Sequence, residues 1–72
     1  MDMKQIGATL RMLRDQKGVS VVTAAKDLDV SVSSLSCYEH GTRIPRDKVK
    51  IRIAEYYGQP LTSIFYAENV HS

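Results

Sequence analysis

The sequence is short of the features that mark secreted and membrane proteins. It holds a single cysteine, Cys37, which cannot close a disulfide within the chain. No stretch is apolar for long enough to cross a bilayer, and no segment has the pattern of a signal peptide. We therefore expect a cytoplasmic protein with no membrane partner.

The chain also lacks the residue groups from which most catalytic and cofactor sites are built. Cys37 and His40 lie one helical turn apart, but a structural zinc site needs four ligands and the only other histidine is His71. The same pair has no third residue to orient it for nucleophilic catalysis. No glycine-rich loop suits a nucleotide phosphate. We expect no metal, no cofactor and no enzymatic activity.

What the sequence does contain is a series of short helical patterns in a chain of 72 residues, enough for one domain with a small core. Apolar residues recur at helical spacing from Met3 to Leu13, and Gly18 ends that pattern. Serines precede the next two helices, as N-caps commonly do. The expected helices span about residues 3–17, 20–28, 32–40, 46–57 and 61–66.

The second and third of these helices, joined by a tight turn at Asp29-Val30, predict a helix-turn-helix. Leu35 and Tyr38 point inward on the third helix, while the opposite face is small, polar and uncharged. A helix with such a face fits the major groove, where it meets base edges and thymine methyl groups. The candidate base-reading residues are Val32, Ser33, Ser36 and Cys37.

Positive charge is concentrated just after this helix, although the formal net charge is only +2. Five cations crowd into ten residues: Arg43, Arg46, Lys48, Lys50 and Arg52. Such a run is often a solvated helix face. Beside a candidate recognition helix, contact with DNA phosphates is the better interpretation.

Residues 6 to 65 resemble the Cro/CI-type (XRE) helix-turn-helix family of phage and bacterial transcriptional regulators. The residues that carry the resemblance are Ile6, Leu10, Leu13, Arg14, Ser20, Ala25, Leu28, Val30, Leu35, the run Tyr38-Glu39-His40-Gly41, Pro45, Ile53-Ala54, Tyr57-Gly58 and Ile64-Phe65. The resemblance implies an all-α, lambda-repressor-like bundle of five helices. It also implies a repressor that binds double-stranded operator DNA as a homodimer, and an ion pair between Arg14 and Glu39.

On this interpretation a second set of side chains holds the DNA backbone. The candidate phosphate-contacting residues are Ser20, His40, Thr42, Arg43 and Arg46. Exposed amides at the helix N-termini would assist them.

Two departures from the family keep an alternative open. Val21 stands where the family usually has a phosphate-contacting Gln, and the recognition face has no Arg, Asn or Gln, the side chains that read bases most strongly. The alternative is a protein-interaction module, such as an anti-repressor, co-repressor or antitoxin-like protein, whose partner is a second regulator protein.

The last helical segment is unusually apolar for so small a bundle. We expect that Leu61, Ile64 and Phe65 cannot all face one core, and that with Tyr66 they form an association surface, for which a homodimer is one explanation. Alternatively, Ile64 and Phe65 seal the core. Residues 1–66 form the predicted domain and residues 67–72 a loose tail.

Overall fold

The computed structural model describes residues 2–66, which form five α-helices with no strand among them. The helices are α1 (Met3–Lys17), α2 (Val21–Leu28), α3 (Val32–His40), α4 (Asp47–Tyr57) and α5 (Leu61–Phe65). The predicted all-α, five-helix fold is confirmed. The tail predicted for 67–72 lies outside the described residues.

Side-chain caps and one left-handed residue shape the pair α2–α3. The Ser20 hydroxyl accepts a hydrogen bond from the Thr23 amide (3.1 Å), and Ser31 accepts one from the Ser34 amide (2.9 Å). Between the two helices Asp29 adopts a left-handed conformation with φ 60°, which Asp tolerates better than most residues. These three local features fix where α2 ends and where α3 begins.

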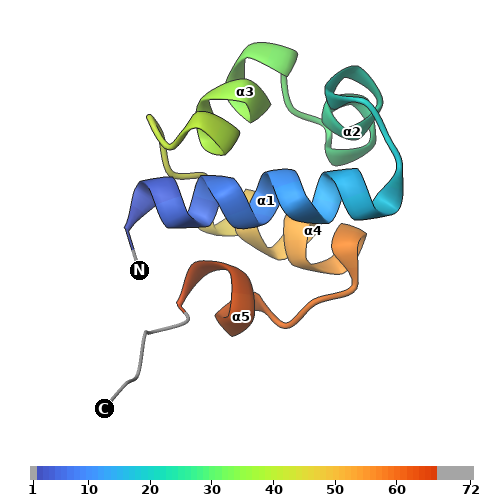
Figure 1. The fold of residues 1–72 in the computed structure, drawn as a ribbon. Coiled ribbons are helices and arrows are strands. Elements are labelled where there is room, and N and C mark those ends of the chain that lie inside the picture. Colours follow the sequence, from blue (N-terminus) through green and yellow to red (C-terminus); the bar gives the residue numbers. More distant parts are fainter. Residues whose placement is uncertain (1, 67–72) are drawn as a thin grey trace.

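The other helices surround α1, which runs through the middle of the molecule (Figure 1). α2 and α3 lie on one side of it and α5 on the opposite side, while α4 passes behind it and contacts α1, α2 and α5. Every helix contributes side chains to a single core. The buried hydrophobic residues are Ile6, Leu10, Leu13, Ala24, Ala25, Leu28, Leu35, Tyr38, Ile53, Ala54, Ile64 and Phe65.

The structure corrects the expectation for the last helix. Ile64 and Phe65 retain only 1% and 4% of their exposure, and Leu61 is partly buried against the same core. The expectation that these three could not face one core is wrong, because α5 packs against both α1 and α4. Tyr66 is half exposed and Leu61 is partly exposed. The alternative, in which Ile64 and Phe65 seal the core, is confirmed.

The most extensive helix pairing is that of α1 with the C-terminal half of α3, and two glycines permit it. A Cβ atom on Gly7 would lie 2.8 Å from both the carbonyl carbon of Glu39 and the carbonyl oxygen of Tyr38. A Cβ on Gly41 would lie 2.8 Å from the Cα atom of Lys4, and Gly41 also has a φ of 76°. The two backbones therefore touch where any side chain would separate them.

Replacement of Gly7 by Ala tests this close approach. Ala normally favours an exposed helix over Gly by about 1 kcal/mol, but here its methyl group would collide with backbone atoms. We expect Gly7→Ala to lower the free energy of unfolding by about 1–3 kcal/mol, measured by urea denaturation followed by circular dichroism. The exposed control Ala8→Leu should change it by less than about 0.5 kcal/mol. A gain in stability for Gly7→Ala would contradict the contact.

Candidate nucleic-acid interface

α3 presents the predicted base-reading residues on its outer side. Val32 is 41% exposed and Ser33 is also exposed, while Ser36 and Cys37 are partly exposed. The inward residues Leu35 and Tyr38 are buried, as their spacing predicts. The four candidates therefore share a surface that is small, neutral and free of long side chains.

Small residues on α2 and an apolar residue in the turn fix the angle between α2 and α3. Ala24 and Ala25 are fully buried, so α3 can pack closely on α2. Val30, in the turn, is partly buried against the same core. Since these contacts are apolar and tightly packed, α3 is presented as a rigid rod.

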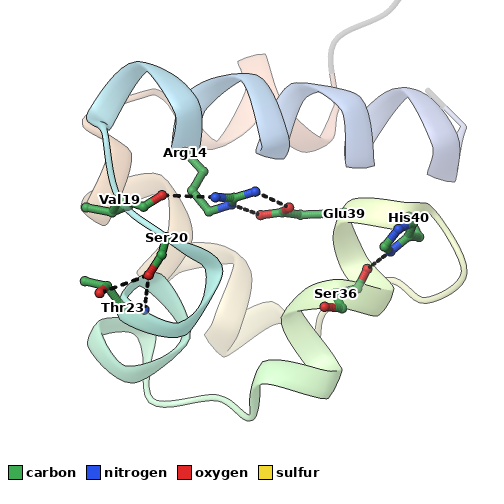
Figure 2. Close-up of polar contacts among 7 residues, drawn as sticks. All are labelled: Arg14, Val19, Ser20, Thr23, Ser36, Glu39 and His40. Atoms are coloured by element: carbon green, nitrogen blue, oxygen red, sulfur yellow. Dashed lines mark hydrogen bonds and ion pairs between the residues drawn. The ribbon is translucent and has the colours of Figure 1, made fainter.

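An ion pair joins α1 to the end of α3. Arg14 Nε and Nη2 donate hydrogen bonds to the two carboxylate oxygens of Glu39 at 2.7 and 3.2 Å, and Arg14 Nη1 donates to the Val19 carbonyl at 3.0 Å (Figure 2). The side chains are only 13% and 6% exposed. The hydrogen bonds and the charge of Glu39 raise the pKa of Arg14 above its ordinary value, although burial opposes this. The ion pair predicted from the sequence is present.

Two arginines lie beside α3 at the start of α4. Arg43 Nη1 donates a hydrogen bond to the Ser34 hydroxyl (3.3 Å), and Arg43 and Arg46 line one cleft of about 380 Å³ together with Ser34 and Tyr38. Arg46 is also the N-cap of α4, and no side chain caps the amides of that helix. Free amides and two exposed cations make this cleft attractive to an anion.

The family comparison agrees with this geometry. A family model described as a helix-turn-helix domain matches residues 5–63. The chain belongs to this helix-turn-helix family. No curated protein matches the chain. The match supports a DNA-binding regulator.

The cations of the basic run differ in their contacts within the fold. Lys50 Nζ lies over the rings of Phe65 and Tyr66, 5.6 and 4.9 Å from their centroids, and donates to the Tyr66 hydroxyl. Arg52 Nη1 donates to the Leu28 carbonyl at 2.8 Å and so ties α4 to α2. Lys48 is exposed. Lys50 and Arg52 are therefore occupied within the fold.

Ser20 and Thr42, two of the predicted phosphate contacts, are exposed, but their hydroxyl groups already donate hydrogen bonds within the protein. Ser20 Oγ donates to the Thr23 hydroxyl (3.2 Å), and Thr42 Oγ1 donates to the Cys37 carbonyl (3.2 Å). A hydroxyl has one hydrogen, so each would have to leave its present partner before it could donate to a phosphate. Among the predicted phosphate contacts, Arg43 and Arg46 are the most available.

The structure adds two cations that the sequence reasoning missed. Lys4 and Arg11 of α1 line one open groove of about 780 Å³ with His40, at the C-terminal end of α3. Their helical spacing places them on the outer face of α1. Lys4 and Arg11 lie near His40 only because α3 packs against α1 in the tertiary structure. The sequence pattern therefore could not predict this proximity.

Other site chemistry finds no support among residues 2–66. That segment holds no group of three or more His, Cys, Asp or Glu side chains able to bind a metal. His71, the second histidine, lies outside it. Within the same segment, no helix has the length and apolarity needed to span a membrane.

Breaking the ion pair at one end should be costly. Arg14→Met leaves the Glu39 carboxylate nearly buried without its partner, so we expect a loss of about 3–5 kcal/mol in the free energy of unfolding. The double variant Arg14→Met/Glu39→Met should lose less than the two single changes together, because no charge is left stranded. Urea titrations of the four proteins measure the coupling.

The second ion pair provides a matched control. Asp47 is 93% exposed and lies 3.8 Å from Lys50. Asp47→Ala should change stability by no more than about 1 kcal/mol. Equal effects of Arg14→Met and Asp47→Ala would show that burial of the first pair does not matter.

Proposed function

We propose that this protein is a sequence-specific regulator of transcription that binds double-stranded DNA through α3. One observation carries the proposal: the outer face of α3 is neutral, and exposed cations stand beside this helix and at its C-terminal end. Arg43 and Arg46 lie beside the helix, and Lys4 and Arg11 lie at its C-terminal end. A neutral helix face with cations near it suits a DNA groove, in which the helix meets base edges and the cations meet backbone phosphates.

The small side chains of α3 suggest how it reads DNA. Val32, 41% exposed, is suited to a thymine methyl group, and the hydroxyls of Ser33 and Ser36 suit hydrogen-bonding base edges. None of these side chains makes the bidentate contact by which Arg selects guanine. Specificity on this proposal comes from several modest contacts, and the phosphate contacts of Arg43 and Arg46 supply much of the affinity.

We further propose a repressor of the Cro/CI type that occupies its operator as a homodimer and blocks a promoter by its presence. An exposed apolar pair supports self-association. Ile51 and Tyr66 are each 50% exposed, and with Leu61 they line a shallow depression of about 210 Å³. The residues that line this depression belong to α4, to α5 or to the position just after α5, and none belongs to α3, so a second copy bound there would leave both recognition helices free.

The salt dependence of DNA binding tests the arginine contacts. Each phosphate contact contributes about 0.9 to the slope of log K against log salt concentration. We expect Arg43→Ala and Arg46→Ala each to reduce the slope by about that amount and to weaken binding to all sequences alike. The slope is measured by fluorescence anisotropy with labelled duplexes. Arg52→Met is the matched control, because it removes from the same basic run a charge whose Nη1 atom is bonded to the Leu28 carbonyl within the fold. Unchanged slopes in both arginine variants would refute the phosphate role.

The second candidate function is a module that binds another regulator protein. It is favoured by the apolar exposure of Val22 (61%) and Val32 (41%) at the N-terminal ends of α2 and α3, where Arg, Asn or Gln would read or hold DNA more strongly.

Selection from a random duplex pool distinguishes the two functions. For the purified chain, we expect enrichment of a two-fold symmetric site with half-sites about 34 Å apart, because a dimer would place its recognition helices one DNA turn apart. Enrichment of single half-sites would retain DNA binding but contradict the dimer. No enrichment by the chain alone, with enrichment restored by a second protein, would favour the interaction module.

A further inference from the structure

His40 is held in one tautomer by the backbone of its own helix. Its Nδ1 atom lies 2.7 Å from the Ser36 carbonyl oxygen (Figure 2). A carbonyl oxygen only accepts hydrogen bonds, so Nδ1 must carry a hydrogen whether the ring is neutral or charged. In the neutral ring the other nitrogen, Nε2, therefore carries no hydrogen and is an acceptor.

This tautomer decides how His40 can meet a phosphate. Phosphate oxygens are acceptors, so a neutral Nε2 facing one offers no hydrogen bond. After protonation Nε2 becomes a donor on a cationic ring and makes a charge-assisted hydrogen bond. The predicted phosphate contact of His40 is thus available only to the protonated side chain.

The surroundings of His40 favour an anion. Lys4, Arg11 and Asp15 of α1 line the same groove, and Glu39 borders it from α3. Both carboxylate oxygens of Glu39 are already bonded to Arg14. Within residues 2–66 neither Lys4 nor Arg11 has an ion-pair partner. Two free cations thus oppose one free carboxylate, and a charged His40 adds a third cation.

We propose that the groove between α1 and the C-terminal end of α3 binds neighbouring phosphates of one DNA strand through Lys4, Arg11 and protonated His40, so that affinity for DNA rises as pH falls. The proposal rests on the DNA-binding function above. It adds a second phosphate-binding site and makes the affinity for DNA depend on pH. Ala8 and Met12, which line the groove between the cations, offer an apolar surface for the adjoining deoxyribose.

DNA binding at two pH values tests the proposal. Histidine changes charge between about pH 5 and 8, so anisotropy titrations at pH 6 and pH 8 are compared, each over a salt series. For the wild-type chain we expect about three- to tenfold tighter binding at pH 6. We also expect a salt slope larger by about 0.9, the mark of one additional phosphate contact.

Two variants identify the residue responsible. His40→Asn supplies an amide that donates at either pH, so this variant should bind with the same affinity and slope at pH 6 and pH 8. His71→Asn removes the other histidine and should keep the wild-type difference. Lys4→Ala and Arg11→Ala should each lower the salt slope by about 0.9 at both pH values.

The outcomes separate this inference from the function on which it rests. A pH difference that survives in His40→Asn, or no difference in the wild type, overturns the inference and leaves DNA binding intact. No binding of duplex DNA at either pH overturns the proposed function and the inference together. A DNA-free measurement completes the test: ¹⁵N chemical shifts of the His40 ring at pH 8 should place the hydrogen on Nδ1, and a hydrogen on Nε2 would refute the tautomer.

Discussion

The ion pair between Arg14 and Glu39 is the interaction on which the position of α3 depends. Arg14 also bonds the Val19 carbonyl, so one guanidinium joins α1, the connection to α2 and the end of α3. Because Glu39 is nearly buried, separation of the pair would strand a charge in the protein interior. Gly7 makes the contact possible, since any side chain there would push α3 away from α1. Contacts on the inner side of α3, near its C-terminal end, therefore fix its position, and its outer side is left free.

The separation of charge from base reading follows from this arrangement. The outer side of α3 carries small neutral side chains, and the cations near it come from other elements. Lys4 and Arg11 belong to α1, and Arg43 and Arg46 belong to the segment that leads into α4. On the proposed function, the phosphate contacts would set the register of the protein on DNA, and the serines and Val32 would discriminate among sequences.

Local features of the structure were predictable from the sequence. Serine caps, the helical spacing of Leu35 and Tyr38, and the break at Asp29 involve residues no more than four positions apart, and the structure has each of them as predicted. The sequence was a poorer guide where distant segments decide the outcome. Lys50 and Arg52 belong to a basic run in the sequence, yet aromatic rings of the α5 region and the Leu28 carbonyl hold them. The buried positions of Ile64 and Phe65 likewise depend on how α5 packs against α1 and α4.

The sequence by itself determined where the helices begin and end and which side of each is apolar, because hydrogen bonds and side-chain spacing within a helix depend on near neighbours. Only the tertiary structure decided which polar side chains remain available to a partner. Lys4, Arg11 and His40 are 29 or more positions apart between α1 and α3, and they line one groove because Gly7 and the Arg14–Glu39 pair bring these two helices into backbone contact.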